Sequence, residues 1–182
     1  NYQVRWSHPQ RNGSVKVKNE FYGVGAEALA KYDARPQTLE SVAGTAARYP
    51  IASDCAVFAD KAVAIAERES MKWRDVYDIA IVGKGPVGTE RPHAEADVQR
   101  ALQATCEIYG VEPASAVDKL EDVLRGEALR NEAAFREDIA RWLPGGEFGP
   151  REASDRLASA RDYLSRQVEA LQGLDADRGM RP

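Results

Sequence analysis

Apolar residues recur at helical spacing along most of this chain, and short turns rich in Gly and Pro separate the segments that carry them. In the segment from Ser53 to about Glu69, for example, Phe58, Ala62 and Ile65 fall on one helical face, and Ser53 is a residue type that favours the N-cap. The other helices predicted in this way span Thr38 to Tyr49, Ser70 to Val82, His93 to Tyr109, Ser115 to Leu124, Glu127 to Leu143 and Arg151 to Gln172. The chain is therefore predicted to be mostly helical.

The N-terminus carries a different pattern. Apolar and polar residues alternate over residues 2–8 and 15–18, and Asn12-Gly13 lies between them. Asn-Gly flanked by alternating runs is typical of a β-hairpin, because both residues tolerate the positive φ of its turn. With this turn, Trp6 pairs with Asn19. Pro9 has no amide proton for a central strand, which favours an edge position.

A lone hairpin is only marginally stable in water, so its apolar face must be covered, and Gly25 to Tyr32 is the nearest candidate helix. We therefore predict an α+β fold, predominantly α, with an N-terminal β-hairpin packed on helices and followed by antiparallel helices. The Gly-rich loop from Gly83 to Pro92 divides the chain into residues 1–92 and 93–182, which are expected to pack as one domain. The run Ile79 to Val82 reads as either a helix end or a strand.

Composition limits the classes of protein to which this chain can belong. At 182 residues the chain is long enough to bury a core without a metal or disulfide, and 43% of its residues are hydrophobic. Its two cysteines form no disulfide framework, which favours a reducing compartment. No apolar run approaches the roughly 20 residues that cross a membrane, and no signal peptide is visible. These features predict a cytoplasmic protein without a membrane partner.

The string from Tyr77 to Gly88 resembles the dinucleotide fingerprint of flavin- and nicotinamide-dependent oxidoreductases, in which an apolar strand runs into Gly-x-Gly-x-x-Gly. That chemistry requires a helix to begin at the third glycine, so that its N-terminus faces the pyrophosphate. Here Pro92 follows closely and no second strand ending in an acidic residue comes after it. A Gly-rich loop between helices is the better interpretation, and no cofactor is expected.

The segment Ser53 to Ala59 is similar to the nucleophile segment of YopJ-like acetyltransferases and ubiquitin-like-protein proteases, in which a cysteine opens a helix. The resemblance implies Cys55 as nucleophile, and the helix dipole would lower the pKa of such a thiol. His8 is the only histidine upstream of it, and Glu20 is the nearest acid that could orient that base. The alternative is that Cys55 is a small buried helix residue.

Charge is unevenly distributed along the chain. Residues 1–25 hold Arg5, Arg11, Lys16 and Lys18 against one acidic residue, a net charge of +3, whereas the remainder carries 21 basic against 28 acidic residues, a net charge of −7. Two-stranded ribbons can contact nucleic-acid phosphates, so these four residues are candidate nucleic-acid ligands. The alternative is a solvated edge kept soluble by lysines.

The remaining polar residues indicate no catalytic centre. Neither His8 nor His93 has a second His or Cys at metal-ligand spacing, so no metal site is expected. Acidic pairs such as Glu121/Asp122 and Glu137/Asp138 have basic neighbours at helical spacing, which is typical of a solvated face. The sequence therefore favours a non-catalytic binding or scaffolding module with a protein partner, cut from a larger bacterial multidomain protein. The alternatives are nucleic-acid contact through the hairpin and a Cys55-dependent acyltransferase or protease.

Overall fold

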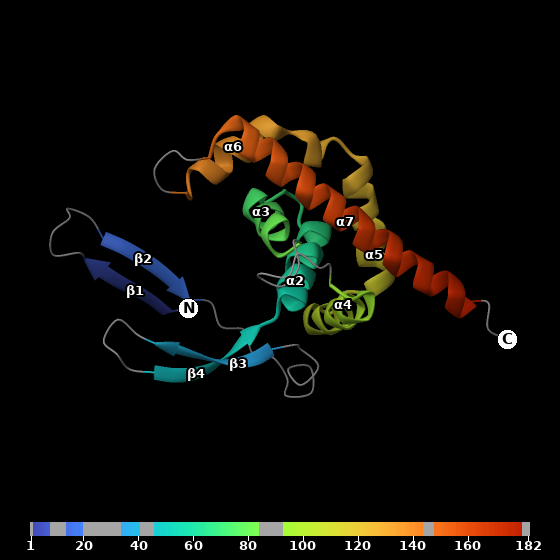
Figure 1. Ribbon diagram of the computed structural model, residues 1–182, viewed down its shortest axis with the longest axis horizontal. Helices are drawn as coiled ribbons and strands as arrows, with labels where there is room; N and C mark the ends of the chain where they lie inside the picture. Colours follow the sequence, from blue (N-terminus) through green and yellow to red (C-terminus); the bar gives the residue numbers. More distant parts are fainter. Residues whose placement is uncertain are drawn as a thin grey trace.

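The computed structural model of the chain describes residues 2–7, 14–19, 34–40, 46–83, 93–143 and 148–179. This part of the chain is predominantly helical, as the periodicity predicts (Figure 1). The strands are β1 (Tyr2–Ser7), β2 (Ser14–Asn19), β3 (Ala34–Glu40) and β4 (Ala46–Ala52). The helices are α2 (Asp54–Glu67), α3 (Trp73–Val82), α4 (Glu95–Tyr109), α5 (Pro113–Arg125), the short 3-10 helix η1 (Ala128–Arg130), α6 (Glu132–Ala140) and α7 (Pro150–Gly179).

The first strand pair is antiparallel, with Val4 opposite Val17 and Trp6 opposite Val15. This register differs from the one expected with a two-residue turn, which places Trp6 opposite Asn19. The described part of the first strand ends at Ser7, and its partner begins at Ser14. The turn at Asn12-Gly13 lies outside the described residues and stays a prediction, as does the packing of the pair on the helices.

The second strand pair replaces a predicted helix. The expected helix from Thr38 to Tyr49 is wrong, because β3 and β4 pair antiparallel across this segment. Pro36 lies opposite Pro50 in the register. Proline disfavours helix in the residue before it, and a two-stranded sheet tolerates proline because both of its strands are edges. The helix expected from Gly25 to Tyr32 lies outside the described residues.

Helix α2 forms as predicted. The amide of Ala56 donates to the hydroxyl of Ser53 at 3.2 Å, which caps the N-terminus. The predicted apolar face is buried, with Phe58, Ala62 and Ile65 all in the core. The local sequence of this segment is therefore sufficient to locate both its start and its buried side.

Helix α3 resolves the ambiguity at Ile79 to Val82. This run is the last turn of a helix, with Ile79 and Ala80 buried. The amide of Gly83 donates to the carbonyl of Ile79 at 2.8 Å and closes that turn. The apolar strand that a dinucleotide fingerprint needs is therefore absent from these described residues.

The predicted helix from Glu127 to Leu143 is broken in the structure. It contains η1 followed by α6, and Asn131 lies between them. The Asn131 side chain accepts from the amide of Ala134 at 3.1 Å. Asparagine competes with the helix backbone and favours an N-cap, which explains why a new helix begins there.

All the described helices contribute to the core: α2 lies against α3, α4 and α5, and α7 lies against α3, α5 and α6 (Figure 1). Aromatic side chains connect the helices edge to face: Phe58 of α2 meets Tyr163 of α7 with ring centroids 5.1 Å apart, and Trp73 of α3 meets Phe135 of α6 at 5.6 Å. Such pairs add to the free energy gained by burying the rings. They fix α3 between its neighbours, and α3 in turn positions the site described below.

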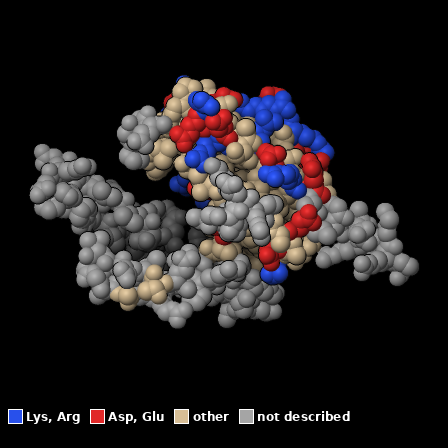
Figure 2. All heavy atoms as spheres, viewed as in Figure 1, with Lys and Arg blue, Asp and Glu red and all other residues tan. Residues whose placement is uncertain are grey.

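The surface of the helices carries interspersed acidic and basic side chains (Figure 2). Arg125 pairs with Glu121, and Arg141 pairs with Glu137 at 2.6 Å, both at i,i+4 spacing. These acidic residues therefore belong to a solvated face, as the sequence indicates. None of the described helices is long and apolar enough to span a membrane.

A close approach of α3 to α7 gives a test of this packing. A Cβ placed at Gly83 would lie 2.5 Å from Cδ1 of the buried Tyr163 and 2.8 Å from the carbonyl oxygen of Ile79. We expect Gly83→Ala to lower the free energy of unfolding by about 1 to 3 kcal/mol, because the ring has no space into which it can move. Urea denaturation measures this. Gly149→Ala is the control, since a Cβ placed at Gly149 would have nothing within 4 Å. Equal effects of the two changes would contradict the packing.

Candidate functional site

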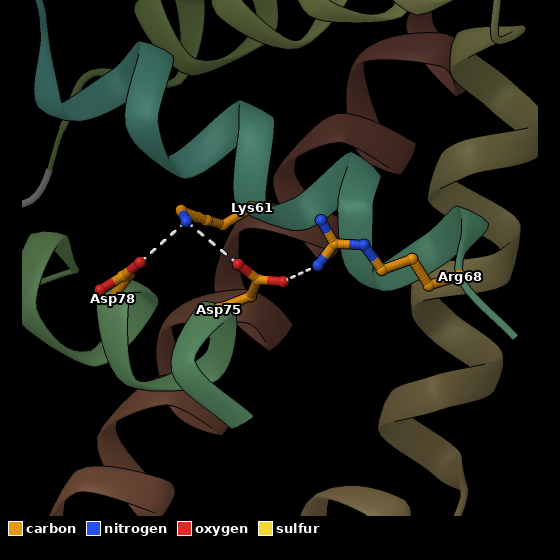
Figure 3. Close-up of polar contacts among 4 residues, drawn as sticks. All are labelled: Lys61, Arg68, Asp75 and Asp78. Carbon is orange, nitrogen blue, oxygen red and sulfur yellow. Dashed lines mark hydrogen bonds and ion pairs between the residues drawn. The ribbon is translucent and has the colours of Figure 1, made fainter. Parts of the chain in front are cut away.

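Two pairs of charged side chains meet where α2 and α3 lie side by side (Figure 3). Lys61 is on α2, and Arg68 is the C-cap residue that follows this helix in an extended conformation. Asp75 and Asp78 are three residues apart on α3 and share a face. We call these four residues the Lys61 cluster.

The geometry of the Lys61 cluster centres on Asp75. Lys61 Nζ lies 3.0 Å from Asp75 Oδ1 and 2.9 Å from Asp78 Oδ2. Arg68 Nη1 donates to the other oxygen of Asp75, Oδ2. Each oxygen of the Asp75 carboxylate therefore has its own cationic partner, as Figure 3 shows.

The four side chains differ in burial. The Asp75 side chain is 3% exposed, whereas Lys61 is 28% and Arg68 is 41% exposed. A buried carboxylate is tolerated only when it is paired and hydrogen-bonded, and Asp75 meets both conditions. The acid is thus an internal anchor, and the two cations remain accessible from solvent.

The ammonium group of Lys61 has a raised pKa. Burial of the ammonium lowers its pKa, but hydrogen bonds to Asp78 and Asp75 and the charges of these carboxylates outweigh burial and raise the pKa above its ordinary value of 10.5. Lys61 is therefore a permanent cation at neutral pH. It is suited to binding an anion and not to accepting a proton.

A cavity of about 500 Å³ opens beside the Lys61 cluster. Its lining combines charged and apolar residues, and it comprises Asp60, Lys61, Val63, Ala64, Glu67, Arg68, Asp75, Tyr109 and Val111. These residues come from α2, from the start of α3 and from the end of α4 with the turn that follows it. The volume is in the range of small-molecule sites, which are concave and combine apolar walls with a few polar groups.

Polar contacts hold α4 and α5 against α2 around the cavity. Thr105 donates to Asp60 at 3.4 Å, and Lys119 contacts Glu67 at 2.9 Å. These contacts engage two of the acidic side chains that line the cavity.

Of the residues proposed for thiol catalysis, the structure places only Cys55. It lies in the first turn of α2 and is 6% exposed. His8 and Glu20 lie outside the described residues. Cys55 therefore occupies a core position, and no described side chain completes the triad that the resemblance implies.

For the basic residues of the N-terminal strands, the structure describes the backbone pairing alone. The register places Arg5 opposite Lys16 and Gln3 opposite Lys18. Arg11 lies outside the described residues, and the side chains of the two strands do as well. Nucleic-acid contact through these residues stays a prediction.

The Lys61 cluster was not predicted from the sequence, where α2 and α3 were read only as apolar stripes. The available signal was Asp75, an acidic residue on the otherwise apolar face formed by Trp73, Val76 and Ile79. A buried acid predicts a nearby cation, since an unpaired one would strongly oppose folding.

The acidic side chains of the Lys61 cluster do not fit a metal ion. No group of three or more His, Cys, Asp or Glu side chains in the described ranges could hold one. Both carboxylates of the cluster are engaged by cations instead. The cluster therefore places two cationic hydrogen-bond donors, whose charges the two carboxylates balance, in the lining of the cavity.

The anchoring role of Asp75 predicts a large effect on stability. We expect Asp75→Ala to lower the free energy of unfolding by about 2 to 4 kcal/mol, because Arg68 loses its carboxylate partner and Lys61 keeps only the more exposed Asp78. Asp78→Ala is the matched control on the same helix: this acid is 40% exposed, and its loss should cost less than about 1 kcal/mol. Chemical denaturation of the two variants measures both changes in the free energy of unfolding. Similar losses would show that burial of Asp75 is not the important difference.

Both cysteines should be unreactive in the folded protein. Burial, followed by the charges of Glu112 and Glu67, raises the pKa of Cys106 to about 11. The reactive species is the thiolate, which is scarce at pH 8 when the pKa is this high. We expect iodoacetamide to label Cys55 and Cys106 only after unfolding, as followed by mass spectrometry with and without denaturant. Rapid labelling of native Cys55 would indicate an exposed, activated thiolate.

Comparison with known proteins identifies the family. Residues 7–167 match the family model described as nucleotidyl transferase AbiEii toxin, type IV toxin–antitoxin system. No curated protein and no solved structure matched the chain. The match overturns the expectation of a non-catalytic binding or scaffolding module, and with it the description of the chain as a protein-interaction module. The chain belongs to the AbiEii nucleotidyl transferase toxin family of type IV toxin–antitoxin systems.

Proposed function

We propose that this chain takes part in nucleotidyl transfer and that its Lys61 cluster binds the phosphates of the nucleoside triphosphate substrate. One observation carries the proposal: a buried carboxylate holds two cations, Lys61 of α2 and the C-cap residue Arg68, in the lining of a cavity of about 500 Å³. Arginine and lysine are the side chains that bind phosphate oxygens, arginine through its planar fork and lysine as a point charge.

Nucleotidyl transfer needs positive charge next to the departing pyrophosphate. An oxygen of the acceptor hydroxyl attacks the α-phosphorus and forms a new P–O bond. The bond from that phosphorus to the oxygen bridging to the β-phosphate breaks, and pyrophosphate leaves with the bonding electron pair. The acceptor proton passes to water. Negative charge grows on the departing pyrophosphate, where Lys61 and Arg68 would stabilise it.

The acidic residues of the Lys61 cluster have a positioning role in this proposal. Asp75 and Asp78 hold the Lys61 ammonium from two sides and keep it protonated. Because their contacts form within the folded protein, little reorganisation is needed when the anion binds.

In this proposal, the protein and nucleic-acid partners expected from the sequence can be specified further. The family description names a toxin–antitoxin system, so the protein partner is an antitoxin in this proposal. A nucleic acid becomes a candidate for the acceptor of the nucleotidyl group. The contact surface for either one is not specified by the described residues.

Substitution of the two cations tests the proposal. We expect Lys61→Met and Arg68→Met each to weaken binding of a nucleoside triphosphate about 10- to 100-fold, since each removes a charged hydrogen bond while keeping an apolar stem. Titration calorimetry with each of the four ribonucleoside triphosphates measures this. Transfer from an α-labelled nucleotide should fall in parallel.

The matched control for these variants is Lys119→Met. Lys119 is a neighbouring lysine, 47% exposed, that pairs with Glu67 and does not line the cavity. We expect the affinity of Lys119→Met for a nucleoside triphosphate to stay within about threefold of that of the parent chain, because long-range charge effects are screened by salt. Parent-like binding by both Lys61→Met and Arg68→Met, with circular dichroism showing that they fold, would rule out this site.

A further inference from the structure

We infer that Tyr109 is a stacking platform for the nucleobase, so that the cavity beside the Lys61 cluster holds a whole nucleotide and not only its phosphates. This inference rests on the proposed function. It is carried by the cavity lining, which brings Lys61 and Arg68, from α2 and its C-terminal end, together with Tyr109 and Val111 from the end of α4. A nucleoside triphosphate carries groups that match both, because it combines anionic phosphates with a flat, weakly polar base.

The exposure of Tyr109 supports a binding role. Among the described residues the large hydrophobic side chains that are exposed are Ile81, Tyr109 and Trp142, and of these Tyr109 lines the cavity with half of its surface (50%) exposed. An aromatic ring retained at the edge of a cavity offers a π-face to a ligand. Stacking on such a ring is the common way in which proteins bind bases without reading their hydrogen-bonding edges.

The backbone around Tyr109 holds this edge of the cavity in place. Gly110 adopts a left-handed conformation with φ of 67°, and the amide of Val111 donates to the carbonyl of Cys106 at 2.9 Å. This pattern ends α4 in a Schellman motif and turns the chain sharply, so that Tyr109 and Val111 both reach the cavity. A glycine is needed at this position because a side chain makes the left-handed conformation costly.

Burial and a polar contact with α2 also hold the end of α4 in place. Cys106 is fully buried, and Thr105 contacts Asp60 of α2 at 3.4 Å. Asp60 is adjacent to Lys61 in the chain, so the platform and the phosphate-binding cation are fixed to the same turn of α2. A platform fixed in this way loses little conformational entropy when the base binds.

The experiment separates base binding from phosphate binding. The probes are ATP and inorganic tripolyphosphate, titrated calorimetrically into the full 182-residue chain and its variants. We expect Tyr109→Ala to weaken ATP binding about 5- to 100-fold, the range measured for loss of one stacked base, and to leave tripolyphosphate binding unchanged. Tyr109→Phe keeps the ring and should restore ATP affinity. CTP, GTP and UTP should respond to the same changes, because stacking tolerates every base.

Each other outcome has a distinct meaning. Parent-like ATP binding by Tyr109→Ala overturns the inference and leaves the proposed function standing. An equal loss for ATP and tripolyphosphate also overturns it, because Tyr109 would then act only by shaping the site. If the parent chain binds neither probe, or if Lys61→Met binds tripolyphosphate as well as the parent does, the proposed function fails and the inference fails with it.

Discussion

The buried carboxylate of Asp75 is the interaction on which the candidate site depends. It lies between α2 and α3 and is paired through one oxygen with Lys61 and through the other with Arg68. An acid buried without these partners would oppose folding, so the two helices must meet in a register that satisfies both oxygens. The same contacts hold the two cations at the cavity. The contacts that stabilise the pair of helices therefore also fix the position of the positive charge.

The aromatic core gives this arrangement its rigidity. Tyr163 of α7 packs on Phe58 of α2 and leaves no space for a side chain at Gly83, so the end of α3 lies close against α7. Because α3 is held from this side, Asp75 is presented to α2 in a fixed position. Binding of an anion then requires little movement of protein charge, which is the condition under which electrostatic stabilisation is most effective. The family match agrees with a catalytic use of such a site.

Local sequence was sufficient where its signals agreed. Ser53 and the apolar face of α2 were predicted correctly, because a capping residue and a clear period coincide there. The prediction failed for Thr38 to Tyr49, where apolar residues at helical spacing compete with Pro50 and the chain forms β3 and β4 instead. It also failed at Asn131, whose side chain caps a new helix within a segment read as continuous. In both cases a local preference for another backbone conformation outweighed the period.

The sequence by itself determined the helical class of the chain and the buried faces of its helices, because hydrophobic periodicity is a local property that a single segment carries. Only the tertiary structure brought Lys61 to Asp75, and it placed Tyr109 on the same cavity from the end of another helix. Periodicity tells which side of a helix is buried, but not which neighbour it meets. The partners of a charged group lie on that neighbour, so a site built across helices is specified only when the helices pack.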